Sequence, residues 1–213
     1  MPNWCKNMLT IKSQHKPLLL DIKESVSNQN PEEGLLNCFR PMPDELKNTV
    51  KGTPIPKWQV DHSQELIKKY GADNWYDWAI AHWGTKWDVT SSHHCELDLI
   101  NLDKRLWMLS IEFESAWSPP EKAIEYFVQY ALKHVDAVQD HEVFTEVTLQ
   151  YIESGMQYCG VRDFLDESNT FFITNYMEEN LPKNIEDKIW LAEEVEAEKD
   201  YQREMDEEWE EDK

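Results

Sequence analysis

Two segments in the second half of the chain alternate strictly between apolar and polar positions. Over 105–115 the odd positions from 107 to 113 are large and apolar, and over 142–152 the odd positions 143, 147 and 149 are apolar too. Alternation with a period of two predicts a β-strand with one buried face. We therefore expect one shared core face, made by Trp107, Leu109, Ile111, Phe113, Val143, Val147 and Leu149.

The segment between these strands predicts a helix that covers their buried face. Ser118 is placed as an N-cap, Pro119 as the first helical residue and Glu121 as the partner that completes a capping box. Apolar residues then recur at helical spacing as far as Val135. A second helix is predicted over 16–26, because Leu18, Leu19, Ile22 and Val26 share one face.

Shorter signals predict the remaining elements. We expect strands at 3–12, 35–40, 87–91, 158–165 and 170–176. We expect short helices that start at Asp61 or Ser63 and at Asp73 or Asn74, and a long helix that starts at Asn184. The breakers Gly52, Pro54 and Pro56 predict an irregular excursion over 44–57.

The order of these elements predicts an α+β fold. Strand, helix, strand, strand, helix, strand is the ferredoxin-like pattern, an antiparallel sheet covered by two helices on one face. On this basis residues 1–177 form one domain with an insertion at about 44–83. Residues 178–213 form an acidic helical extension.

Charge narrows the classes of function. The chain has 213 residues, 42 of them acidic and 21 basic, for a net charge of −21. Direct binding to nucleic acid or to an anionic membrane needs clustered Lys and Arg, so we expect neither partner. There is no apolar run long enough to span a membrane, and the first seven residues lack the pattern of a secretory signal. We expect a cytoplasmic protein with four reduced cysteines.

The C-terminal segment is the most acidic part of the chain. Residues 178–213 hold 16 of the acidic residues and 5 of the basic ones. Tyr201, Met205 and Trp209 stand four apart within it, which places them on one helical face. A tail that only increases solubility does not need large apolar residues. We expect this face to dock on the body or on a partner protein, and the alternative is a solvated or disordered terminus.

A tryptophan-rich string is the second candidate site. Trp83-Gly84-Thr85-Lys86-Trp87-Asp88 suits a recognition loop, in which the indoles form a platform and Lys86 and Asp88 fix polarity. The alternative is structural: the indoles anchor the insertion on the sheet, and Asp88 caps a turn. The candidate binding residues of this region are Trp75, Trp83, Lys86, Trp87, Asp88 and Trp117.

Signals for catalysis or metal binding are weak. His93, His94 and Cys95 are adjacent, but a zinc site needs four converging ligands, so no metal is expected. Glu112 and Glu114 share the polar face of a predicted strand, which is typical of a solvated surface. No fingerprint of a phosphate, dinucleotide or hydrolase site is present. We therefore expect no cofactor and regard an enzyme as the weaker alternative.

Several strings together resemble a known family. They are residues 1–7 (Met-Pro-Asn-Trp-Cys-Lys-Asn), Pro41-Met42-Pro43 with Leu46, residues 74–78 (Asn-Trp-Tyr-Asp-Trp), residues 82–88 (His-Trp-Gly-Thr-Lys-Trp-Asp) and residues 116–120 (Ala-Trp-Ser-Pro-Pro). In order and spacing they resemble the YubB ferredoxin-like, or Api-like, family of phage and plasmid proteins, over roughly residues 1–165. The resemblance implies a ferredoxin-like fold in a mobile genetic element. It implies no established reaction, and it does not extend to the acidic tail.

These observations lead to two hypotheses about function. The first is a non-enzymatic phage or mobile-element protein that binds a host protein with a basic surface, for counter-defence or host takeover. Its sharper form is acidic mimicry of nucleic acid. The second is a small-ligand-binding protein or enzyme with a pocket lined by Trp75, Trp83, Lys86, Trp87 and Asp88.

Overall fold

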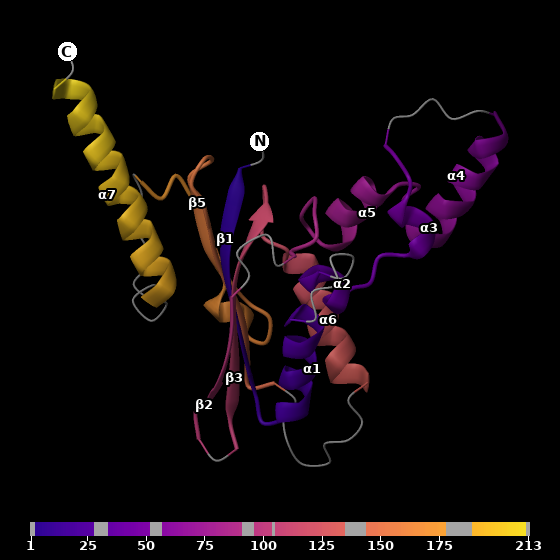
Figure 1. Cartoon of the computed structure of the whole chain (residues 1–213), viewed down its shortest axis with the longest axis horizontal. Coiled ribbons are helices and arrows are strands. Elements are labelled where there is room, and N and C mark those ends of the chain that lie inside the picture. The colour runs from indigo at the N-terminus through magenta and orange to yellow at the C-terminus, as the bar shows by residue number, and fades with distance from the viewer. Residues whose placement is uncertain are drawn as a thin grey trace.

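A computed structural model of the chain shows an α+β architecture built on one six-stranded antiparallel sheet (Figure 1). It describes residues 3–27, 34–51, 57–90, 96–103, 105–134, 144–177 and 189–211. The strand order is β2-β3-β1-β4-β5-β6. The strands are β1 (Trp4–Ser13), β2 (Glu96–Asn101), β3 (Trp107–Ala116), β4 (Glu146–Glu153), β5 (Tyr158–Asp163) and β6 (Phe171–Thr174).

Helices lie on both faces of the sheet. α1 (Lys16–Ser27) and α6 (Glu121–His134) cover one face, and α7 (Ile189–Glu211) lies on the other (Figure 1). The remaining helices are α2 (Leu35–Phe39), α3 (Asp44–Lys47), α4 (Lys57–Tyr70), α5 (Trp75–His82) and the 3-10 turn η1 (Glu167–Asn169). No described helix is both long enough and apolar enough to cross a bilayer.

The face under α1 and α6 is the main core, as the alternating pattern predicts. Leu109, Ile111 and Phe113 of β3 are buried, and register places Leu9 of β1 between Ile111 and Leu149 of β4. Val147 is also buried, while Trp107 is half-buried against the cluster. Val143 lies outside the described residues.

The opposite face carries a second, smaller core under the inner half of α7. Leu191 and Val195 are buried there against residues of the last three strands and the segment after them: Ile152, Cys159, Val161, Ile173 and Tyr176. The helix is described from Ile189, and the predicted start at Asn184 lies outside the described residues. Part of the acidic extension is therefore packed against the body.

Several local predictions are wrong. Residues 35–39 form helix α2 instead of a strand, and 87–90 form no strand. The strand beside β3 is β2, which the pattern did not reveal. The segment 44–57, predicted to be irregular, contains α3. α4 begins at Lys57, before the predicted caps at Asp61 or Ser63.

Candidate functional site

The two distinctive tryptophan strings pack against each other. The Thr85 hydroxyl donates to the Ala116 carbonyl at 2.6 Å, and the Ser118 hydroxyl donates to the Gly84 carbonyl at 2.6 Å. Gly84 has a φ of +89°, and a Cβ there would come within 3.3 Å of the Pro119 carbonyl oxygen. Only glycine combines this backbone conformation with so close an approach. The loop 83–88 is therefore fastened to the segment that precedes α6.

This contact also corrects the predicted helix cap. α6 begins at Glu121, and the Ser118 hydroxyl is committed to the Gly84 carbonyl instead of a helical amide. The Trp83 carbonyl in turn accepts the Ala123 amide of the first turn, at 3.4 Å. A partner distant in sequence thus replaces the local capping box.

Trp83 is a buried core residue at the end of the insertion. It is 4% exposed, and its indole N–H donates to the Arg40 carbonyl at 2.8 Å. Its ring meets Trp78 edge-on, with 5.5 Å between ring centroids. Trp75 is half-buried and also contacts the core cluster. Both indoles contact the core, as the structural alternative for this string predicts.

Asp88 caps helix α2 from fifty residues away. Its carboxylate accepts the amides of Leu36 at 2.8 Å, Asn37 at 3.1 Å and Val89 at 2.7 Å. A Cβ at Gly34 would lie 2.4 Å from Asp88 Oδ1, so the carboxylate lies directly over the glycine. Burial raises the pKa of Asp88 to about 6, against the opposing effect of these amides. The carboxylate explains why residues 35–39 are helical.

Lys86, Trp87 and Trp117 remain partly accessible. The Lys86 ammonium lies 4.4 Å from the centroid of the Trp87 ring. The ring centroids of Trp87 and Trp4 are 6.2 Å apart. Trp117 has a φ of +73° and is 44% exposed, and its carbonyl accepts the Tyr158 hydroxyl at 2.7 Å. The structure therefore divides the six residues predicted in this region, with Trp83 and Asp88 used internally.

In the described parts of the chain, no three His, Cys, Asp or Glu residues are grouped so that they could hold a metal ion. His93, His94 and Cys95 lie outside the described residues. The Glu146 carboxylate forms an ion pair with Lys12 at 2.8 Å, so it is engaged by a cation. Burial raises the pKa of the Cys5 thiol strongly, which disfavours the nucleophilic thiolate.

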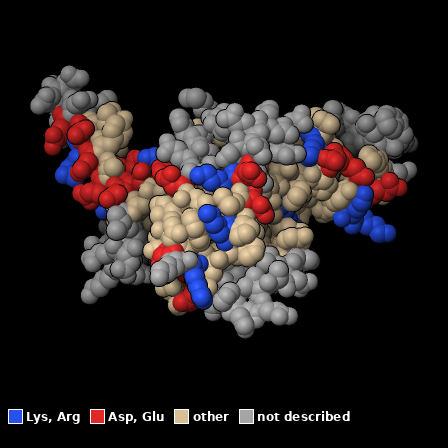
Figure 2. All heavy atoms as spheres, turned by 60° about the horizontal axis from the view of Figure 1, so that its bottom comes forward, with Lys and Arg blue, Asp and Glu red and all other residues tan. Residues whose placement is uncertain are grey.

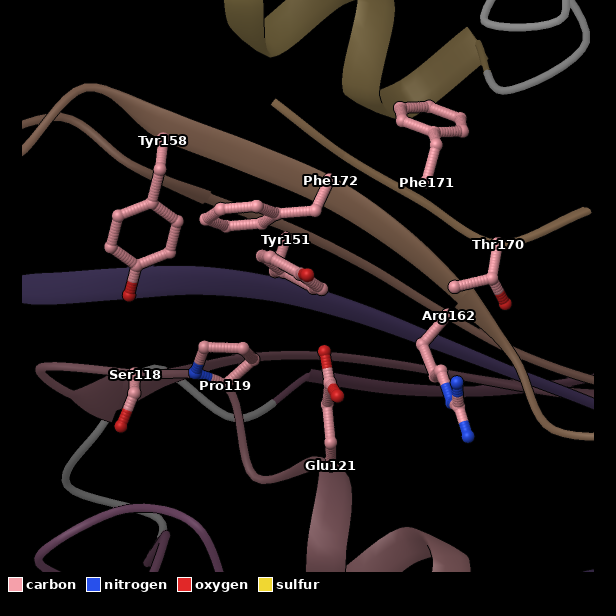
Figure 3. Close-up of a pocket in the computed structure, with 9 residues that line it drawn as sticks. All are labelled: Ser118, Pro119, Glu121, Tyr151, Tyr158, Arg162, Thr170, Phe171 and Phe172. Atoms are coloured by element: carbon pink, nitrogen blue, oxygen red, sulfur yellow. The ribbon is translucent and has the colours of Figure 1, made fainter. Parts of the chain in front are cut away.

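A cavity of about 570 Å³ opens beside the start of α6 (Figure 3). It lies on the α6 side of the sheet, between β4, β5 and β6 and the start of the helix (Figure 3). The residues that line it are Ser118, Pro119, Glu121, Tyr151, Tyr158, Arg162, Thr170, Phe171 and Phe172. Its size is in the range of small-molecule sites.

Three aromatic rings form the floor of this cavity. Register aligns Tyr151 of β4, Gly160 of β5 and Phe172 of β6 across the sheet. The centroid of the Tyr158 ring lies 6.3 Å from that of Tyr151 and 5.6 Å from that of Phe172. A Cβ at Gly160 would approach the Tyr151 hydroxyl to 2.6 Å. Glycine therefore makes the room that Tyr151 occupies.

The polar groups of the cavity differ in the contacts that they make. Burial raises the pKa of Tyr151, and the charge of the nearby Glu121 carboxylate raises it further. The phenol therefore stays protonated. Arg162 is half-buried, and its guanidinium lies over the Phe164 ring, 5.8 Å from the ring centroid, with no ion pair to any described residue. Figure 3 shows Arg162 and Glu121 projecting into the same space.

Sequence reasoning missed this cavity. Its floor needs three strands in a specific register, and its wall needs the first turn of α6. One signal was present, since Gly160 interrupts the apolar pattern of a predicted strand. Such a glycine often marks a close approach of another group.

The second predicted site, the tail, divides into two halves. In the inner half, residues 189–200, Glu194 and Glu198 pair with Lys6 of β1 at 2.6 and 3.8 Å. We call residues 201–211 the outer arm. Every side chain described there, from 201 to 207, is exposed, including Tyr201 at 60% and Met205 at 44%. The side chain of Trp209 lies outside the described residues.

Charge is concentrated on the same helix. Figure 2 shows acidic side chains gathered along α7, which extends away from the body at the left. In the loop Trp83 is buried and Trp87 is half-buried, whereas Tyr201 of the outer arm is exposed.

Comparisons with known proteins identify no relative: no family model, no curated protein and no solved structure matches the chain.

Proposed function

We propose that this chain is a non-enzymatic binding protein that engages a partner with a basic surface through the outer arm of α7. The observation that carries the proposal is the exposure of Tyr201 and Met205 on a helix whose inner half is already docked. Exposed large apolar residues next to charged ones are typical of a helix that binds a partner.

The charge of the molecule supports a basic partner. The net charge of −21 steers an oppositely charged protein toward the surface, and the acidic side chains around Tyr201 add local attraction. The apolar pair then supplies contacts that lose water on binding. Steering by charge acts mainly on the association rate, and the apolar contacts act mainly on the dissociation rate.

For the fold, we propose a ferredoxin-like domain. The strand order β2-β3-β1-β4, with antiparallel neighbours and with α1 and α6 on one face, supports this proposal. β5, β6 and α7 are then additions to that unit. The resemblance to YubB-like proteins supports a phage or plasmid setting, a cytoplasmic location in the host and a role in counter-defence or host takeover.

Acidic mimicry of nucleic acid is the sharper form of this proposal. Carboxylates that follow one helix resemble a row of phosphates, and a partner that normally holds duplex DNA would accept them. Duplex DNA should then displace the protein from its partner. A partner that binds DNA and this chain together would rule out mimicry and leave basic-surface binding intact.

The experiment begins by crosslinking from the outer arm. A photo-reactive residue at position 205 captures a partner from bacterial lysate, and the same residue at exposed Ile67 of α4 serves as the control. The purified partner is then measured by surface plasmon resonance at two salt concentrations. Glu204→Gln with Glu207→Gln should slow association, and Tyr201→Ala with Met205→Ala should speed dissociation.

The result that supports the proposal is a partner with a basic surface, captured from position 205 and absent from position 67. Its association with the parent must slow as salt increases, because ions screen the attraction. Equal capture from both positions, or binding that ignores salt and both variants, would overturn the proposal.

A further inference from the structure

We propose that the cavity beside α6 binds a free α-amino acid with an aromatic or similarly flat apolar side chain. The proposal is separate from the partner-binding role of α7. It rests on three features of one cavity: an aromatic floor, a cation that contacts a ring but has no anionic partner among the described residues, and a carboxylate (Figure 3).

The floor selects a flat apolar group. Tyr151, which lies over Gly160, forms this floor with Tyr158 and Phe172, and Phe172 is 58% exposed. An aromatic ring placed against Phe172 covers this exposed face and gains stacking contacts. Phe171 comes from the same strand but packs with the α7 core, so it offers the cavity little.

The two charges select the head group. Arg162 and Glu121 both line the cavity, yet no ion pair joins them. If the two charged groups formed an ion pair, no room for a ligand would remain between them. As it stands, a carboxylate can pair with the Arg162 guanidinium while an ammonium pairs with Glu121. A free α-amino acid carries both groups on one carbon atom.

The Glu121 carboxylate lies close enough to Tyr151 to raise the pKa of that phenol, and it keeps acceptor capacity for an ammonium. The other phenol, Tyr158, donates to the Trp117 carbonyl at 2.7 Å and so fixes the adjacent wall. The Tyr158 phenol is therefore held in place before any ligand arrives.

Ligands with a single charge fit less well. A simple anion pairs with Arg162 but meets the Glu121 carboxylate, and a simple amine pairs with Glu121 but meets the Arg162 guanidinium. A neutral ligand removes water from both charges and compensates neither. The zwitterion also avoids a penalty from the net charge of −21, because its own net charge is zero.

The first test uses the unaltered protein, so folding of a variant is not at issue. Isothermal titration calorimetry compares L-phenylalanine with 3-phenylpropionate, which lacks the ammonium, and 2-phenylethylamine, which lacks the carboxylate. L-phenylalanine should bind with a dissociation constant of about 1 mM or tighter. Each analogue should bind at least ~10-fold more weakly, since each loses one charge-assisted pair.

Variants then assign the groups. Arg162→Gln should weaken L-phenylalanine at least ~10-fold and leave 2-phenylethylamine no weaker. Glu121→Gln should weaken L-phenylalanine similarly and leave 3-phenylpropionate no weaker. Arg203→Gln on exposed α7 is the matched control and should change nothing. Thermal melts report whether each variant is folded.

Two results would overturn the proposal. One is no heat from L-phenylalanine at concentrations well above 1 mM, about the weakest dissociation constant that the proposal allows. The other is equal affinity for the amino acid and both analogues, because apolar contact alone would then explain binding. Neither result bears on the partner of the outer arm.

Discussion

The loop 83–88 and the outer arm of α7 have similar compositions and opposite roles. Both combine aromatic residues with charges, and both stand out in the sequence as candidate binding sites. In the loop, the Trp83 ring is buried and the Asp88 carboxylate caps α2. In the outer arm, Tyr201 and Met205 face solvent.

The difference shows that an unusual sequence string can be required by the fold and need not indicate a binding site. The Thr85 and Ser118 hydroxyls join the two tryptophan strings, so fold stability alone explains much of their composition. No comparable contact explains Tyr201 or Met205 among the described residues. The predictions below test this division between residues that hold the fold and residues that remain accessible.

The largest effect should come from Trp83. Trp83→Ala removes a buried ring and its hydrogen bond to Arg40, and it should lower the free energy of unfolding by about 3–5 kcal/mol. The half-buried Trp87 is the internal comparison, and Trp87→Ala should cost less than half as much. Urea melts measure both. Equal losses would mean that the loop is not divided as described.

The inner half of α7 should come next. Leu191→Ala opens a cavity in the second core and should cost about 2–4 kcal/mol. Met205→Ala, on the same helix but in the exposed arm, should change stability by less than about 0.5 kcal/mol. A loss below 1 kcal/mol for Leu191→Ala would show that the inner half does not dock on the sheet.

A pH-dependent effect should follow from Asp88. Its pKa is raised to about 6 from 3.8, so between those values the folded protein holds a proton that the unfolded chain has released. The stability that this proton contributes is lost as pH rises through 6. The stability of the parent relative to Asp88→Asn should therefore fall by about 1 kcal/mol or more from about pH 4 to pH 7. A constant difference across that range would contradict the environment described for Asp88.

The sequence was sufficient for the elements with a long periodic pattern. The alternation around Ile111 and Leu149 identified β3 and β4, because burial of one sheet face forces a period of two. α2 was misassigned because five residues carry little periodicity, and the carboxylate that caps it lies at position 88. β2 was missed because it is a six-residue edge strand in which the alternation lasts only from Glu96 to Leu99 and reverses at Ile100 and Asn101.

The sites were less accessible to sequence reasoning. The spacing of Tyr201 and Met205 predicted one helical face, but not whether that face would meet the sheet. The outcome depends on Leu191 and Val195, which dock first and leave the later turns beyond the sheet. The cavity depends on strand register, which places Tyr151 beside Gly160 and cannot be read from either strand alone.

The central claim, that the outer arm binds and does not stabilise, is tested most directly by one variant measured in two ways. Tyr201→Ala with Met205→Ala is compared with the parent for free energy of unfolding and for affinity to the partner crosslinked from position 205. We predict a stability change below about 0.5 kcal/mol and an affinity loss of at least ~10-fold. A stability loss above about 1 kcal/mol, or an unchanged affinity, would contradict the account.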